Sequence, residues 1–185
     1  PPLRGLTYVG GSWHWPSRGN SGGGGPAGTR VPNAGYHFVQ WSDASVANPR
    51  TDTNVTANVN VTATFAIDTY TLTYTAGANG TISGTSPQTV NSGANGTPVT
   101  AVPNAGYHFV QWSDASVTNP RTDTNVTANI SVTASFAINT YTLTYTAGPN
   151  GTITGTSPQT VNSGGSGTAV TARPDAGYHF GPASD

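Results

Sequence analysis

The chain has 185 residues and a formal net charge of −1, with six basic and seven acidic residues. Every basic residue is arginine and every acidic residue is aspartate, so lysine and glutamate are absent. This balance provides no charged surface for nucleic acid or an anionic membrane, and we expect neither nucleic-acid binding nor membrane insertion. The absence of cysteine excludes disulfide bonds, thiolate zinc sites and cysteine nucleophiles.

The distribution of residue types favours strands over helices. Branched and aromatic residues recur at short intervals, and Gly, Thr, Asn, Ser and Pro fill the gaps between them. Such a pattern is typical of short strands joined by tight turns, so we predict an all-β fold. No stretch reaches the roughly 20 apolar residues of a membrane-spanning helix. The chain starts at Pro1 without an apolar signal region, and we expect that any export signal has been removed.

Residues 1–30 form a glycine-rich segment that we predict to be an N-terminal arm or linker. Residues 7–9 are predicted to form a short strand. Trp13 and Trp15 leave two interpretations open. The segment is either a flexible remnant of a preceding domain or a docking arm whose tryptophans insert into a groove of a neighbouring subunit.

An internal repeat dominates the rest of the chain. The string Ala-Gly-Tyr-His-Phe ends at Phe38, Phe109 and Phe180, which gives a period of 71 residues. Residues 31–75 align without a gap with residues 102–146 and differ at only five positions. We therefore predict tandem small β-rich modules of about 71 residues. The predicted parts are the back half of a unit at 31–69, a complete unit at 70–140 and the front half of a unit at 141–185.

The first part of the complete unit combines alternation with turn signals. Residues 70–74 alternate between apolar residues and threonine, which indicates a strand. Asn79-Gly80 favours the positive-φ turn of a β-hairpin, with residues 81–85 returning beside the first strand. A second turn at 91–96 precedes a predicted strand at 97–102.

The second part of the complete unit contains the longest predicted strand, at residues 130–138. A turn at 103–106 leads into a strand at 107–112, and residues 113–125 form a polar stretch. Because side chains alternate along a strand, Trp112 shares a face with Tyr107 and Phe109 only if the strand has a bulge. The predicted repeat core comprises Tyr107, Phe109, Trp112, Ile130, Val132 and Phe136.

Four strings in this unit resemble the divergent internalin-type B-repeat family. They are Tyr-Thr-Leu-Thr at the start, Gly-Tyr-His-Phe-Val-Gln-Trp-Ser-Asp at 106–114, Asn119-Pro120, and Thr-Ala-Ser-Phe-Ala at 133–137. The resemblance covers about residues 31–180. It implies β-grasp-like or sandwich-like modules strung along bacterial cell-surface and secreted proteins as stalks, spacers or interaction surfaces. It implies no catalytic or cofactor-binding residues.

The two predicted half units are complementary, because the front half lacks the strand that the back half contains. They are expected to pair within one chain or head to tail between chains, and a head-to-tail contact that does not close builds a filament. Adding a strand contributes several backbone hydrogen bonds worth about 0.5–1.5 kcal/mol each and buries Phe and Ile at about 1.5–3 kcal/mol each. The sum of these contributions exceeds the ~8 kcal/mol of a micromolar contact. The alternative is a repeat array cut out of phase. The residues predicted to take part in assembly are Trp13, Trp15, Phe65, Ile67, Tyr141, Leu143, Tyr145 and Phe180.

Two kinds of polar residue recur once per repeat. His37, His108 and His179 have no second histidine nearby, so we predict exposed strand histidines rather than metal ligands. The paired aspartates are Asp43 with Asp52 and Asp114 with Asp123. They occupy a polar loop where turn capping is favoured over calcium binding. An ion pair from Arg121 to Asp114 or Asp123 remains open.

No pattern in the sequence indicates an enzyme. No G-x-S-x-G nucleophile elbow follows a buried strand, and no pair of carboxylates is set apart for glycoside hydrolysis. We expect no cofactor. The aromatic residues of the 107–112 strand are predicted to form core rather than a sugar-stacking platform.

The sequence therefore predicts a structural subunit of an extracellular bacterial appendage or surface stalk whose partner is a copy of itself. Its sharper form is a filament built by strand complementation between half repeats. The alternative is an adhesive surface module that binds glycans or host protein through the repeated loops 42–54 and 113–125.

Overall fold

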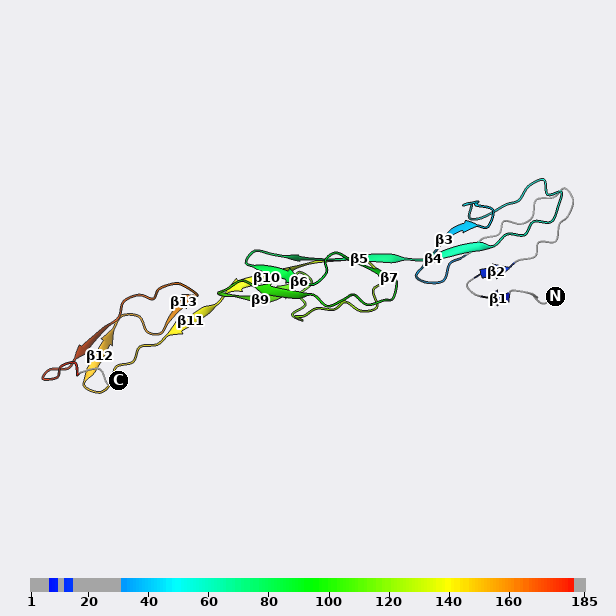
Figure 1. Ribbon diagram of the computed structural model, residues 1–185. Helices are drawn as coiled ribbons and strands as arrows, with labels where there is room; N and C mark the ends of the chain where they lie inside the picture. Colours follow the sequence, from blue (N-terminus) through cyan, green and yellow to red (C-terminus); the bar gives the residue numbers. More distant parts are fainter. Residues whose placement is uncertain (1–6, 10–11, 15–30, 182–185) are drawn as a thin grey trace. The chain divides into compact units, whose positions relative to one another are not determined.

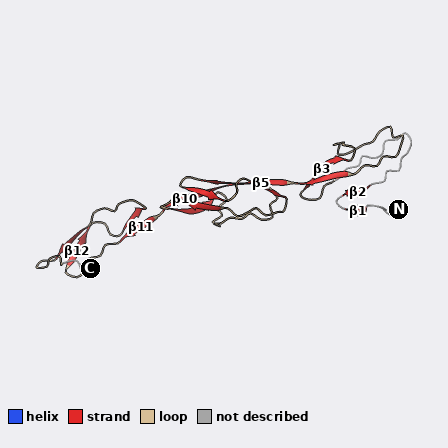
Figure 2. Ribbon diagram, in the orientation of Figure 1, coloured by secondary structure: helices blue, strands red, loops and turns tan. Residues whose placement is uncertain are grey.

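A computed structural model describes residues 7–9, 12–14 and 31–181 of the chain. The described residues form strands, turns and loops and contain no helix, which confirms the predicted all-β fold (Figure 2). None of them therefore forms a helix long and apolar enough to cross a membrane.

Fourteen strands follow one another along the described residues (Figure 1). Their bounds are β1 (Thr7–Val9), β2 (Ser12–His14), β3 (Tyr36–Trp41), β4 (Ala63–Ile67), β5 (Thr69–Ala76), β6 (Gly80–Ser83), β7 (Gln88–Asn91), β8 (Thr100–Pro103), β9 (Tyr107–Trp112), β10 (Ile130–Ile138), β11 (Thr140–Leu143), β12 (Gly151–Thr154), β13 (Gln159–Asn162) and β14 (Thr171–Pro174).

The chain divides into two compact units, which we describe separately. The first contains the described residues up to Leu72 together with residues 87–97 and 122–130. The second contains residues 73–86, 98–121 and those from 131 onward. Two of the boundaries inside the complete repeat fall within β5 and β10.

The first unit is organised around the antiparallel pair β3–β4. The pairing shifts register between Phe38 and Gln40, so that Phe38, Trp41 and Phe65 gather on one face, with the Phe38 ring 5.6 Å from Trp41 and 6.0 Å from Phe65. Trp41 and Ala63 are buried there. The predicted strand at residues 7–9 is β1, which pairs with β2, and β2 lies near β4 without joining its sheet.

The second unit holds most of the buried hydrophobic side chains among the described residues. Trp112, Val99 and Ala134 are fully buried, and the Tyr74 ring contacts the Trp112 ring edge to face at 6.0 Å. β9 pairs with β10 across a register shift that brings Phe109 and Trp112 to the same side, 5.8 Å apart. This register shift is the bulge that the spacing requires if Trp112 is to share a face with Phe109.

Sheet order corrects one sequence prediction. The strand after Asn79-Gly80 does not return beside the strand before it, because β6 pairs with β8 while β5 is hydrogen-bonded to β7 and β10 in a sheet of order β7-β5-β10-β9. Asn79 does adopt a positive φ of 69°, but the turn redirects the chain into a second sheet. Strand β12 after Asn150 repeats this arrangement by pairing with β14.

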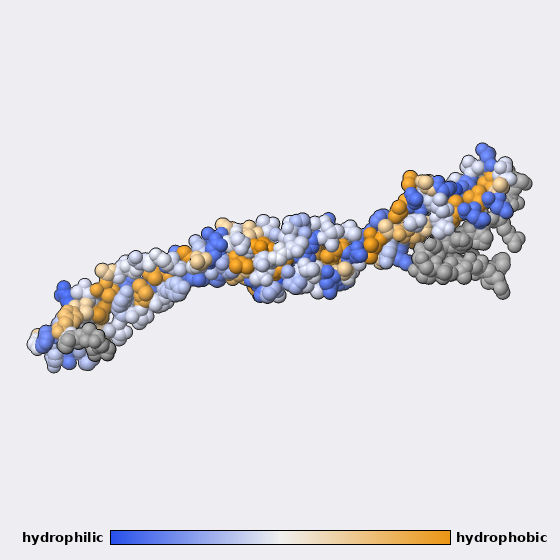
Figure 3. All heavy atoms as spheres, in the orientation of Figure 1, coloured by the Kyte–Doolittle hydropathy of each residue, from blue (hydrophilic) through white to orange (hydrophobic). Residues whose placement is uncertain are grey.

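The surface of the described residues mixes polar and apolar side chains. Figure 3 shows hydrophobic residues interspersed with hydrophilic ones on the visible face. Several valines recur as exposed residues at equivalent positions of successive repeats, among them Val39 with Val110 and Val46 with Val117.

Candidate functional site: loop clamp, module junctions and C-terminal groove

A buried arginine fixes the polar loop of the complete repeat. The Arg121 side chain, 7 % exposed as a residue, lies with its guanidinium 5.6 Å from the centre of the Trp112 ring. Its Nη1 lies 2.7 Å from Asp114 Oδ2, and Trp112 Nε1 donates to the Thr118 carbonyl at 3.0 Å. Strand, aromatic ring and loop are thereby held together by a cation–π contact, an ion pair and a hydrogen bond.

Asp114 combines the two roles that the sequence left open. Its Oδ1 accepts a hydrogen bond from the Ser116 amide at 3.2 Å, which caps the turn, and its Oδ2 pairs with Arg121. Burial by itself raises the pKa of Asp114, but the Arg121 hydrogen bond, the Ser116 amide and the Arg121 charge outweigh it and hold the pKa below the ordinary value.

The same clamp occurs in the back half at the N-terminal side. Arg50 lies 5.6 Å from the Trp41 ring centre and pairs with both Asp43, at 2.8 Å, and Asp52, at 2.7 Å. Trp41 Nε1 donates to the Ala47 carbonyl at 2.8 Å. The hydrogen bond to Asp52, and to a smaller extent the hydrogen bond to Asp43, raise the pKa of Arg50. The hydrogen bond from Arg50 in turn lowers the pKa of Asp43.

A single connecting residue joins one module to the next at each of two junctions. Asp68 lies between β4 and β5; its amide donates to the Gly35 carbonyl, and its carbonyl accepts from the Ser92 amide, both at 2.8 Å. A Cβ atom on Gly35 would lie only 2.5 Å from Ser92 Oγ, so the serine side chain fills the space that glycine leaves.

Asn139 repeats this arrangement between β10 and β11. Its amide donates to the Gly106 carbonyl and its carbonyl accepts from the Ser163 amide, again both at 2.8 Å. A Cβ atom on Gly106 would lie 2.9 Å from Ser163 Oγ. The two junctions therefore share backbone bonds and packing although the connecting residue differs.

The repeated histidines lie beside these junctions. His37 Nδ1 lies 2.7 Å from Asp68 Oδ1, and His108 Nδ1 lies 2.8 Å from Asn139 Oδ1. His179 lies near the end of the described chain, where it lines a groove together with residues 172–174. Among the described residues, no three histidine, cysteine or acidic side chains come together as a metal site.

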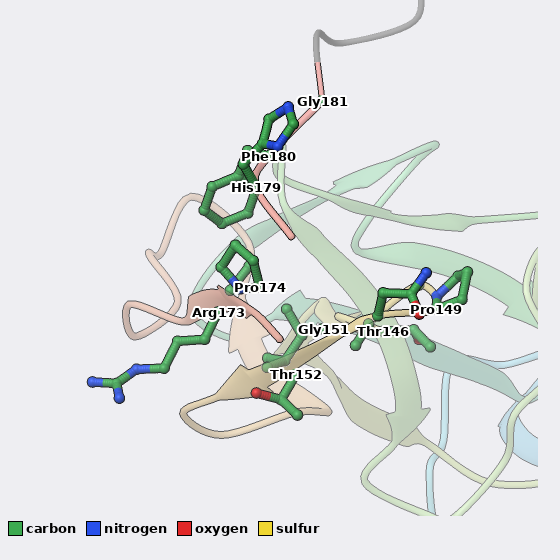
Figure 4. Close-up of a pocket in the computed structure, with 14 residues that line it drawn as sticks. Thr146, Pro149, Gly151, Thr152, Arg173, Pro174, His179, Phe180 and Gly181 are labelled. Atoms are coloured by element: carbon green, nitrogen blue, oxygen red, sulfur yellow. The ribbon is translucent and has the colours of Figure 1, made fainter. Parts of the chain in front are cut away.

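An open groove of about 240 Å³ lies on the C-terminal half repeat. We call it the C-terminal groove. Figure 4 shows Gly151 and Thr152 of β12 beside Arg173 and Pro174 of β14, the strand with which β12 is paired, and Phe180 beyond them. Its volume is below the about 300–1,000 Å³ of typical small-molecule sites. The residues lining it are 146–153, 172–174 and 179–181.

The residues predicted for assembly fall into three groups. Tyr141, Tyr145 and Phe180 are exposed and Leu143 is half-buried in the C-terminal half. Phe65 and Ile67 are half-buried on β4. Trp13 belongs to β2 and pairs in register with Tyr8, whereas Trp15 lies outside the described residues.

The residues predicted for the repeat core lie together around one tryptophan. Trp112 is fully buried and therefore has no exposed ring face on which a sugar could stack. Val132 is also buried, and Tyr107, Phe109, Ile130 and Phe136 are half-buried.

Two side-chain amides that the sequence analysis overlooked hold the complete repeat together. Buried Gln88, on a strand that was not predicted, donates to the Thr97 carbonyl at 2.9 Å and accepts from the Thr97 amide at 2.7 Å. Asn119 makes the same two-way contact with Ala101, at 2.8 and 2.9 Å. The sequence signal for this strand was the pair Thr89-Val90, which lies between two clusters of turn residues.

These features define a class of protein: small all-β modules in tandem, joined by short connections and carrying no catalytic constellation among the described residues. The chain belongs to the divergent InlB B-repeat domain family, whose model matches residues 20–69, 70–140 and 141–182. The family is one of bacterial surface repeat domains and is not known for enzymes. Searches of curated proteins and of solved structures found no match.

The first family match begins eleven residues earlier than the repeat start at 31 inferred from the sequence. Asn20-Ser21-Gly22, in the segment predicted to be an arm, stands one period before Asn91-Ser92-Gly93.

Proposed function

We propose that this chain is a structural segment of an extracellular bacterial surface protein, acting as a stalk or spacer. The observation that carries the proposal is the junction, which occurs twice with the same backbone hydrogen bonds and the same glycine–serine packing. A chain that places one module after another by a repeated contact adds length in equal steps.

The connections support transmission of force rather than free motion between modules. Only Asp68 separates β4 from β5, and only Asn139 separates β10 from β11. Both backbone groups of each connecting residue are hydrogen-bonded, so the junction lacks the long unpaired segment of a flexible linker. Tension applied along the chain would pass directly from one strand into the next.

The structural role can be tested on cells. The chain is placed between a cell-wall anchor and an epitope, and period-length segments (70–140) are added in tandem within the same polypeptide. We expect antibody access to the epitope above the cell wall to increase with each added repeat. An unstructured linker of equal length, rich in Gly and Ser, serves as the control, and access that depends on chain length alone would contradict the proposal.

The sharper form of the proposal is a filament in which half repeats of successive chains complete each other. Electron microscopy and light scattering of the purified chain at micromolar concentration test it. Regular fibres that disappear when residues 1–67 are deleted support assembly between chains. A uniform monomer contradicts filament formation and leaves the stalk.

Adhesion is the second candidate, and one observation favours it. Val46 and Val117 are 72 % and 70 % exposed at the same position of loops that the arginine clamps hold in place. A fixed loop with an exposed apolar residue is a feature of protein-recognition surfaces. Binding of glycans or host protein that is lost when both valines are changed to Asp, with folding intact, would support adhesion over a purely structural role.

A further inference from the structure

We infer that the two arginine clamps protect the repeats against proteases that cleave after basic residues. Such an enzyme takes the whole side chain of a lysine or arginine into its specificity pocket before it cuts the following peptide bond. The described residues contain three side chains of this kind, Arg50, Arg121 and Arg173, and each is withheld from the enzyme. The inference goes beyond the proposed stalk role, because it concerns how the chain stays intact and not how it adds length.

The absence of lysine removes the most accessible kind of cleavage site. Lysine is almost never fully buried, because its ammonium group is compact and strongly hydrated. The chain has no lysine, and its charged residues amount to 7 %, against roughly 25 % in ordinary soluble domains. Arginine is therefore the only residue of this chain that a protease of this specificity can use.

Arg121 is held by its side chain and by its backbone. The residue is 7 % exposed, its guanidinium lies over the Trp112 ring, and its Nη1 is paired with Asp114. Its amide donates to the Val99 carbonyl at 2.8 Å, and its carbonyl accepts from the Val99 amide at 2.9 Å. Because all these contacts must break before a protease can bind Arg121, cleavage has to wait until the loop opens.

Arg50 has the same protection one period earlier in the sequence. Its side chain is 12 % exposed and lies over the Trp41 ring. Asp43 and Asp52 both pair with it, so two ion pairs must break before the guanidinium can leave. Burial of the arginine is therefore a property of the repeated loop and not of one copy.

Arg173 is exposed, and proline protects it instead of burial. Figure 4 shows its side chain extending away from β14, with Pro174 as the next residue. Proline lacks a backbone N–H, and its ring restricts the residue before it, so the bond between Arg173 and Pro174 fits poorly into a protease that binds an extended substrate. The exposed arginine among the described residues thus stands at a bond that such an enzyme cuts poorly.

The test separates burial of the arginine from rigidity of the loop. Val117 is 70 % exposed in the same loop, four residues before Arg121. Val117→Arg places an exposed cleavage residue in this loop, and Val117→Gln is the matched control without one. Val46→Arg and Val46→Gln repeat the comparison beside Arg50, where Val46 is 72 % exposed. Circular dichroism and thermal unfolding check that the four variants fold as the wild type does.

The full chain is digested with trypsin under native conditions, and mass spectrometry assigns each cut to its peptide bond. We expect the Val117→Arg variant to be cut after residue 117 at least about 10-fold faster than the wild type is cut after Arg121, since the rate follows the population of the open form. Val117→Gln should be cut after Arg121 as slowly as the wild type. In urea, where the clamps are lost, the wild type should be cut readily after both Arg50 and Arg121.

Pro174→Ala tests the exposed arginine in the same digestion. We expect this variant to be cut after Arg173 and the wild type to resist at that bond. If the variant resists as well, pairing of β14 with β12 and not the proline protects Arg173, and the role given to Pro174 is wrong.

Cleavage of the folded wild type after Arg121 as fast as that of Val117→Arg after residue 117 would overturn the inference. So would a Val117→Arg variant that resists trypsin, because a rigid loop would then be sufficient without a buried arginine. Neither result bears on the epitope experiment, which measures the length that each repeat adds, so failure of the inference and failure of the stalk role are distinguishable.

Discussion

Residues 70–104 and 141–175 have nearly the same sequence, yet the two segments bury their side chains to different extents. Leu72 and Tyr74 are buried in the complete repeat, whereas Leu143 and Tyr145 are half-buried and exposed in the C-terminal half. The strands themselves form in both places: β11 pairs with β13 in the register in which β5 pairs with β7. The difference lies in β10, which is present beside β5 and absent beside β11.

The comparison separates the formation of strands from the formation of a core. Local alternation and turns are sufficient to place β11 to β14, including the two-way hydrogen bonds of Gln159 with Thr168 at 2.6 and 2.8 Å. Core burial needs a strand supplied by a distant part of the sequence. Residues 141–174 therefore form paired strands without the closed core of the complete repeat.

The largest expected effect comes from truncating the same leucine in the two settings. Leu72→Ala should lower the free energy of unfolding of the complete repeat by about 2–5 kcal/mol because it leaves a cavity in a closed core. Leu143→Ala should cost the C-terminal half about 1 kcal/mol or less, since its side chain is already partly in water. Hydrogen exchange measured by mass spectrometry reports the stability of each repeat separately. Equal losses of stability in the two variants would contradict the difference in burial between the two leucines.

The two equivalent glycines, Gly77 and Gly148, provide a second test of the difference between the complete repeat and the C-terminal half. Gly77→Ala should destabilise the complete repeat by about 1–3 kcal/mol, because the added methyl group collides with the Ala134 carbonyl. Gly148→Ala in dilute, unassembled chain should have no destabilising effect, because its site is open. Urea unfolding of both variants at low concentration measures the difference, and a similar loss in each would show that Gly148 is already covered.

The arginine clamps offer a comparison between the complete repeat and the N-terminal back half. Arg121→Lys should cost about 1 kcal/mol, because lysine lacks the planar group that lies over Trp112. Arg50→Lys should have a similar effect, because the Trp41 contact has the same 5.6 Å distance. Thermal unfolding followed by tryptophan fluorescence measures both effects. No effect at either site would show that the arginine clamps do not stabilise the loops.

Acid should weaken the complete repeat through Asp114. The folded-state pKa of this carboxyl lies below its ordinary value of 3.8, so its contribution is fully present above that pH and is lost as the pH falls through the folded-state pKa. The effect is small because the carboxyl is well exposed. Asp114→Asn should remove this part of the loss of thermal stability between pH 5 and 2. If stability falls with pH as steeply as in the wild type, other carboxyls are responsible for the acid sensitivity.

The smallest effect is expected at the junctions. Asp68→Asn gives the first junction the same connecting residue as the second, and we expect a change of less than about 0.5 kcal/mol, because an exposed histidine–carboxylate pair contributes about 0–1 kcal/mol. Added salt should also weaken the wild-type contact between His37 and Asp68, whereas it should not weaken the contact between His108 and Asn139. Unfolding at low and high salt measures this, and a large loss would mean that the junction depends on charge.

The period of 71 residues, the all-β fold and most of the strands could be predicted from the sequence, because alternation and turn residues are local signals. The spacing of Tyr107, Phe109 and Trp112 showed that these side chains share a face only if the strand has a bulge, and the structure decided that it does. Sequence reasoning overlooked β7, whose four residues are too short to show alternation, and it paired the strand after Asn79-Gly80 with the wrong neighbour.

The pairing of strands and the burial of their faces could not be predicted, because both depend on contacts between distant parts of the chain. The pairing of β6 with β8, the Phe136 ring on Gly80 and the glycine–serine contact at each junction join residues far apart in the sequence. Identical residues are buried in one copy and exposed in another because burial depends on a neighbouring strand and not on the residue.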